Sequence, residues 1–215
     1  MRQFGNFKYR IEKRKIAIVE YCGETKTVIV PKTIKGLPVT RIDGGAFAFE
    51  DYCTPIEHLI LPDSVTEIGY AAFEGCYALK SITSLKSVSK IEHFAFLRCH
   101  SLETVSLSDK LTEIEAGAFC DCYSLNNIIL PESVTEIGVG AFTNCTSLNS
   151  ITLSSKVTYI GAEAFKGCSS LAIYCEAETM PEPVGIWIGW DEEWNPDERP
   201  VYWGIKQEKD SNPQG

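Results

Sequence analysis

The chain has 215 residues, of which 44% are hydrophobic and 23% are charged, a composition typical of a folded protein with a sizeable core. Its net charge of −9 and pI of about 4.9 argue against a nucleic-acid groove or an anionic membrane as the binding partner. No stretch approaches the roughly 18 consecutive apolar residues of a membrane span, so no membrane insertion is expected. The start lacks the apolar run of a secretory signal. As written, the sequence indicates a cytoplasmic protein, or a cell-surface or secreted one if a leader has been removed.

The N-terminal region contains two short segments with the composition of strands. They cover residues 7–11 and 16–21 and flank a basic turn, Lys13-Arg14-Lys15. This pattern predicts a β-hairpin. We interpret residues 1–30 as a capping hairpin with the first half-repeat.

A motif then recurs with a period of 23 residues. Its cysteines are Cys53, Cys76, Cys99, Cys122, Cys145 and Cys168, and its phenylalanines, each preceded by Ala, are Phe47, Phe73, Phe96, Phe119, Phe142 and Phe165. A leucine-type pattern follows each cysteine, with the form L-x-x-I-x-L at residues 148–153. One such unit has too few apolar side chains to form a core alone. We therefore expect the units to stack, with their short strands paired at about 4.8 Å.

The repeat resembles the BspA-like leucine-rich repeats, whose signature is roughly S-L-x-x-I-x-L-P-x-S-V-T-x-I-G-x-x-A-F-x-x-C. The segment SLNNIILPESVTEIGVGAFTNC, residues 124–145, matches it closely. The resemblance covers about residues 22–175 and implies an α/β fold. The expected fold is a leucine-rich-repeat solenoid, a right-handed horseshoe-like coil with a parallel sheet on one side and short helical turns on the other. We assign residues 31–175 to the repeats, 176–205 to an irregular Trp/Pro-rich cap and 206–215 to a flexible tail.

The cysteine column allows several chemical interpretations. Disulfides have no natural pairing, because these cysteines are equivalent positions in successive coils. Zinc requires clustered ligands, and a catalytic thiol requires a neighbouring base, and the sequence offers neither. We interpret the column as small buried side chains that satisfy backbone groups of a turn in each coil. By its spacing to the apolar residues that follow, we place Cys22 in the same column.

All four tryptophans lie near the C-terminus, at Trp187, Trp190, Trp194 and Trp203. One interpretation is a cap whose large rings cover the last coil, with each indole N–H bonded nearby. The alternative is an aromatic platform that binds a glycan. The first interpretation is the one that the family resemblance favours.

The two ends of the chain carry opposite charge. Residues 176–215 contain ten acidic and three basic residues, a net charge of −7, whereas residues 1–20 have a net charge of +4. Weak head-to-tail self-association is one consequence to consider.

The residues between the inward apolar positions of the strands should point out of the open face. They are Thr27, His58, Ile60, Ser81, Thr83, Thr104, Ser106, Asn127, Ile129, Ser150 and Thr152. They offer no acid–base pair and no Ser–His–Asp arrangement, so the sequence predicts no enzyme, no cofactor and no metal site. The expected function is a non-catalytic scaffold for an unknown protein partner, because the resemblance implies adhesion to proteins and cell surfaces. The alternative is a carbohydrate-binding module that uses the tryptophans.

Overall fold

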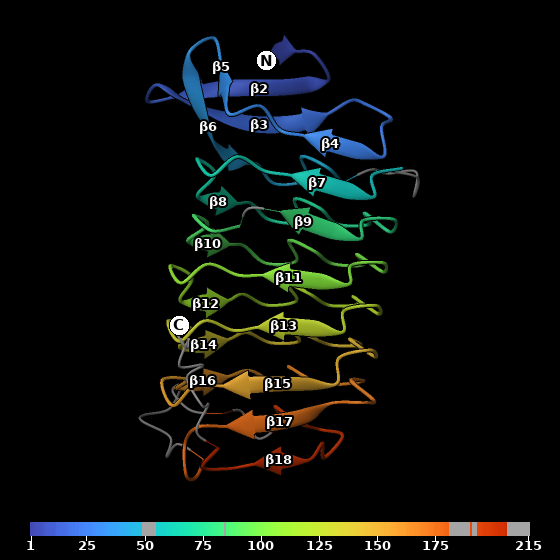
Figure 1. The fold of residues 1–215 in the computed structure, drawn as a ribbon, viewed down its shortest axis with the longest axis vertical. Coiled ribbons are helices and arrows are strands. Elements are labelled where there is room, and N and C mark those ends of the chain that lie inside the picture. Colours follow the sequence, from blue (N-terminus) through green and yellow to red (C-terminus); the bar gives the residue numbers. More distant parts are fainter. Residues whose placement is uncertain (49–54, 84, 181–189, 191–192, 206–215) are drawn as a thin grey trace, which may run out of the picture.

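The computed structural model describes residues 1–48, 55–83, 85–180, 190 and 193–205, which form eighteen β-strands and no helix. Figure 1 shows the strands stacked in successive layers along one long axis, with the N-terminal strands at one end and β18 at the other. The chain therefore forms a solenoid, and successive coils lie on one another.

The N-terminal end is closed by an antiparallel unit. Strands β1 (Arg2–Phe4), β2 (Phe7–Glu12) and β3 (Lys15–Tyr21) pair in that order, and β3 then pairs in parallel with β6 (Leu37–Ile42). The short strand β5 (Thr33–Ile34) is antiparallel to β6. Strands thus occur where the sequence suggested a hairpin, around the turn at Lys13 and Arg14.

One side of each coil contributes a strand to a parallel ladder. In spatial order its strands are β4 (Thr27–Ile29), β7 (His58–Ile60), β9 (Ser81–Thr83), β11 (Thr104–Ser106) and β13 (Asn127–Ile129), with β15 (Ser150–Leu153), β17 (Ala172–Cys175) and β18 (Val201–Tyr202) beyond them. Thr104 of β11 lies opposite Asn127 of β13, a step of one 23-residue period. The sequence period therefore equals one coil.

A second side carries shorter parallel strands. They are β8 (Glu67–Ile68), β10 (Lys90–Ile91), β12 (Glu113–Ile114), β14 (Glu136–Ile137) and β16 (Tyr159–Ile160), which continue the ladder that begins at β6. Each ends in an isoleucine that points into the core.

The third side differs from the expected short helical turns. Its described residues form turns, because two positions in each coil have positive φ and interrupt any right-handed helical run. The first position is occupied by Ala71, Phe94, Gly117, Gly140 and Glu163, with φ from 50° to 61°, and the second by Gly75, Arg98, Asp121, Asn144 and Gly167, with φ from 59° to 74°. The described structure is therefore all-β rather than α/β.

The core consists of columns of identical side chains. Phe47, Phe73, Phe96, Phe119, Phe142 and Phe165 are all buried and lie one above another. The N–H of Phe119 donates to the carbonyl of Ala141 in the next coil at 2.8 Å, and the other coils repeat this bond. Tyr21 stacks on Phe47 at one end of the column, and Trp194 contacts Phe165 edge-on at the other.

The ladder cysteines line the same interior. Cys76, Cys99, Cys122, Cys145 and Cys168 are buried, and each thiol donates to the carbonyl of a phenylalanine one coil earlier, at 3.0 to 3.3 Å. Burial raises the pKa of the Cys99 thiol well above its usual value. Cys99 is therefore neutral, and each of the five thiols satisfies a backbone acceptor. Cys53 lies outside the described residues.

Cys22 was expected in this column, and that prediction is wrong. Its thiol is exposed and bonds to Glu20 at 3.3 Å. Tyr21 occupies the position of the phenylalanine column, since its N–H donates to Ala46 as that of Phe47 donates to Ala72. Cys22 therefore follows the aromatic residue directly, whereas a ladder cysteine such as Cys76 follows its phenylalanine, Phe73, by three positions.

The C-terminal segment is hydrogen-bonded to the last coil. The N–H of Glu163 donates to the carbonyl of Glu193 at 2.8 Å, and the N–H of Gly167 donates to Oδ2 of Asp197 at 2.6 Å. Trp190 forms a parallel bridge with Ile160. The segment thus occupies the place of a further coil. The expected flexible tail, residues 206–215, lies outside the described residues.

Candidate functional site

The long parallel ladder presents an outward surface, which we call the open sheet face. Its middle column is buried, as at Leu59 and Val105, so the residues on either side point outward. Those residues are Thr27, His58, Ile60, Ser81, Thr83, Thr104, Ser106, Asn127, Ile129, Ser150 and Thr152, and all are exposed except Ser81 and Thr152, which are half-buried. The structure therefore brings all the candidate face residues together on one surface.

The open sheet face is uncharged and carries isolated apolar side chains. Ile29, Ile60 and Ile129 are 64%, 38% and 69% exposed in the column otherwise occupied by hydroxyls. Nδ1 of His58 lies 2.9 Å from the hydroxyl of Ser81, so His58 belongs to a surface hydrogen bond between neighbouring strands. The face thus combines a few exposed apolar side chains with hydroxyl and amide groups.

The face extends further than the sequence suggested, because two tyrosines continue the outer column. Thr152 lies opposite Tyr174, and Tyr174 lies opposite Tyr202 on β18. Their rings stack at 5.1 Å with planes 16° apart. The sequence pattern missed Tyr174 because Leu171 and Ile173 are two residues apart in this repeat, whereas Leu148 and Ile151 are three apart.

A second aromatic stack lies where the third side leads into the face strands. Tyr77, His100 and Tyr123 follow consecutive ladder cysteines, with ring centroids 4.6 and 4.7 Å apart. Burial lowers the pKa of His100, since the imidazolium form would lose solvation between the two rings. The imidazole is therefore neutral at pH 7. The 23-residue spacing of these residues could have revealed the stack.

Charged residues border the face at its N-terminal end. The carboxylate of Glu57 lies 2.6 Å from the ammonium group of Lys26 and 2.7 Å from that of Lys80. Hydrogen bonds from Lys26 and Lys80 lower the pKa of Glu57 to about 2. These three side chains link the coils of β4, β7 and β9 outside the neutral surface.

The tryptophans lie away from the open sheet face. Trp190 and Trp194 are only 7% and 6% exposed, in T-shaped contact at 4.8 Å, and Trp203 stacks on Trp190. The indole N–H of Trp190 donates to the carbonyl of Val157 at 3.4 Å. The rings of Trp190 and Trp194 are therefore covered by protein, whereas Trp203 is half-buried. Trp187 lies outside the described residues.

Among the described residues no cluster of three or more His, Cys, Asp or Glu side chains is arranged to hold a metal ion. A helix capable of crossing a bilayer is likewise missing from the part of the chain that the structure describes.

Stacked parallel strands, a leucine-type inward column and one outward polar face define a leucine-rich-repeat solenoid. The chain belongs to the BspA-type family: the family model described as "BspA type Leucine rich repeat region" matches residues 40–172 in 6 copies. No curated protein sequence matches the chain.

Solved structures of bacterial leucine-rich-repeat proteins are similar to the chain. A leucine-rich-repeat protein of T. pallidum is 34% identical, with a TM-score of 0.77, over 85% of this chain and 84% of that one. A leucine-rich cell surface protein of Faecalibacterium prausnitzii is 30% identical, with a TM-score of 0.66, over 84% of this chain and 55% of that one. For a leucine-rich-repeat protein of Bacteroides ovatus the identity is 28% and the TM-score 0.54, over 78% of this chain and 39% of that one. The chain thus spans about half or less of the latter two proteins.

Proposed function

We propose that the chain is a non-catalytic binding module that docks another protein on the open sheet face. The observation that carries this proposal is the exposure of Ile29, Ile60 and Ile129 on a surface of hydroxyl and amide groups. Large apolar side chains among short polar ones are typical of protein interfaces, where the apolar groups anchor and the polar groups orient the partner. The stacked pair Tyr174 and Tyr202 extends this surface at its C-terminal end.

Adhesion is the biological role that we infer. The similar protein from Faecalibacterium prausnitzii is described as a cell surface protein, and proteins of the leucine-rich-repeat family typically mediate protein interaction or adhesion. A rigid ladder suits this role, because its side chains are held by the backbone and lose little freedom on binding.

Glycan binding by the tryptophans has less support. A sugar stacks on an accessible ring face, and two of the three described tryptophans, Trp190 and Trp194, are buried against each other, with Trp194 also against Phe165.

Affinity capture with matched variants tests the proposal. The folded protein serves as bait for its own cell lysate and for surface extracts of surrounding cells. The variant Ile60→Arg/Ile129→Arg places two positive charges on the open sheet face. The control Tyr70→Arg/Val139→Arg places two positive charges on the third side, where these side chains are 55% and 50% exposed. We expect the captured protein to bind the face variant about tenfold or more weakly and to bind the control unchanged. Equal binding to both variants would reject the open sheet face as the docking surface.

A further inference from the structure

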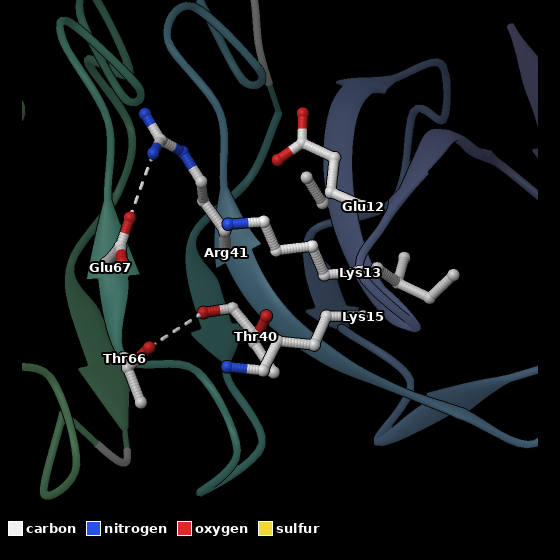
Figure 2. A pocket seen from close by; sticks show the side chains of 9 residues that line it. Glu12, Lys13, Lys15, Thr40, Arg41, Thr66 and Glu67 are labelled. Atoms are coloured by element: carbon white, nitrogen blue, oxygen red, sulfur yellow. Dashed lines mark hydrogen bonds and ion pairs between the residues drawn. The ribbon is translucent and has the colours of Figure 1, made fainter.

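A groove lies near the N-terminal end, between the β2–β3 turn and the strands β6 and β8. It has a volume of about 500 Å³, and its lining includes Glu12, Lys13, Lys15, Arg41 and Glu67. Figure 2 shows the side chains of Lys13 and Lys15 extending from the turn across the groove toward Arg41 and Thr40. This surface belongs to the β6–β8 ladder and not to the open sheet face.

The acidic residues that line the groove are already paired. Glu12 lies 2.7 Å from Nε of Arg10, and Glu67 lies 2.8 Å from Nη1 of Arg41. The remaining guanidinium nitrogens of Arg41 face Asp43 at 2.9 Å and Glu92 at 3.5 Å. The four carboxylates of Glu12, Asp43, Glu67 and Glu92 thus share the cations of Arg10, Arg41 and Lys90, which leaves one negative charge in excess.

The two lysines have no such compensation. Among the described residues, no carboxylate lies within ion-pairing distance of Lys13 or Lys15. Their two positive charges exceed the single surplus negative charge of these ion pairs, so the groove and its surroundings have a net charge of +1. This small positive charge favours a ligand that supplies a carboxylate.

The backbone conformation of the β2–β3 turn does not require a lysine at position 13. Lys13 and Arg14 occupy the two central positions between the paired residues Glu12 and Lys15, with φ of 45° and 62°. Two-residue hairpin turns with positive φ favour Asn-Gly, because larger side chains are strained there. Lys13 thus stands where folding alone favours another residue, which indicates a role for its charge in the groove.

A matching acidic segment exists at the opposite end of the solenoid. Its described residues, 176–180, 190 and 193–205, contain five acidic residues and one basic residue, a net charge of −4, and Glu178 and Glu198 are exposed. In Figure 1 the groove-forming turn and β18 lie at opposite ends of the long axis, so one molecule can present its acidic end to the basic end of the next. We propose that the groove receives the acidic C-terminal segment of a second copy of this chain, and that copies therefore associate head to tail.

Sedimentation velocity of the full chain tests this proposal. Association should be present at about 20 mM NaCl and lost at about 500 mM, because salt screens charges beyond a few ångströms at that concentration. Lys13→Glu/Lys15→Glu should weaken association about tenfold or more, since like charges would then face each other. The control Lys86→Glu/Lys110→Glu changes the net charge equally at exposed lysines elsewhere and should leave association close to that of the unaltered chain.

A charge-swap mixture makes the test specific. Glu178→Lys/Glu198→Lys should also weaken self-association, and a mixture of this variant with Lys13→Glu/Lys15→Glu should restore hetero-association, since each then offers the other a complementary end. A chain that is monomeric at low salt, a groove variant that still associates, or a mixture that stays dissociated overturns the proposal. The face variant Ile60→Arg/Ile129→Arg should self-associate normally, so this test and that of the docking surface can fail independently.

Discussion

Phe119 and Phe142 stack with ring centroids 5.6 Å apart and planes within 4° of parallel, although they are a full repeat apart in sequence. The same relation holds between Phe96 and Phe119 at 5.2 Å and 7°. Because each ring contacts only the rings of adjacent coils, the stability of the solenoid depends on contacts between nearest neighbours.

Phe119→Ala should therefore be strongly destabilising. The side chain is fully buried between two rings, and removing such a side chain typically costs about 3–5 kcal/mol in the free energy of unfolding. Damage in the middle of the column should also uncouple the two halves, so that chemical denaturation shows two transitions. Phe4→Ala, at a side chain that is 46% exposed, is the control. Unchanged stability in Phe119→Ala would mean that the column is not buried.

Trp194→Ala should open the C-terminal end. Trp194 covers Phe165 edge-on at 6.1 Å, so its loss exposes the end of the phenylalanine column, and we expect the thermal midpoint to fall. Tryptophan fluorescence of the native protein should not respond to soluble glycans, because Trp190 and Trp194 are buried. A saturable fluorescence change with a glycan would instead support the sugar-binding alternative.

Thiol reagents should distinguish Cys22 from the ladder. Cys22 is exposed and should react first, whereas Cys120 is half-buried, and burial raises its pKa to about 11, so it should react slowly. The buried ladder thiols should react only after unfolding, when all nine cysteines become accessible. Cys22→Ser should remove the fast phase. Six or more reactive thiols in native protein would contradict the buried column.

The ion pairs of Glu57 should make stability depend on pH. Its pKa in the folded state is about 2, below the ordinary value of 4.5, so the folded state favours the carboxylate. The stabilisation is complete above about pH 4.5 and is lost as the pH falls toward about 2. Glu57→Gln has no such titration. The difference in unfolding free energy between the unaltered chain and Glu57→Gln should therefore shrink as the pH falls from about 4.5 to about 2. A difference that stays constant with pH would exclude the ion pairs as its cause.

The periodic part of the structure could be predicted because every coil repeats the same burial pattern. The cysteine and phenylalanine spacings gave the register, and the residues between the inward positions, such as Thr104 and Ser106, are indeed exposed. Local deviations could not be predicted in the same way. One residue fewer between Leu171 and Ile173 obscured Tyr174 on β17. The direct succession of Tyr21 and Cys22 moved a thiol outward.

The turns of the third side were mistaken for helices for a different reason. Residues such as Ala71, Phe94 and Glu163 carry no sequence signal for positive φ, a conformation usually associated with glycine. Bonds between coils impose it instead, as when the N–H of Phe94 donates to the carbonyl of Ala116. Tertiary structure thus overrides local preference at these positions.

The hydrogen bonds between coils run along the long axis, which determines how the molecule responds to mechanical load. If one end is anchored and the other is pulled, the bonds of a terminal coil carry the force before those of the coils behind it. Each coil that peels away releases 23 residues, about 80 Å of extended chain. A tether built in this way would lengthen in equal steps and dissipate work at each of them, while the remaining coils stay folded.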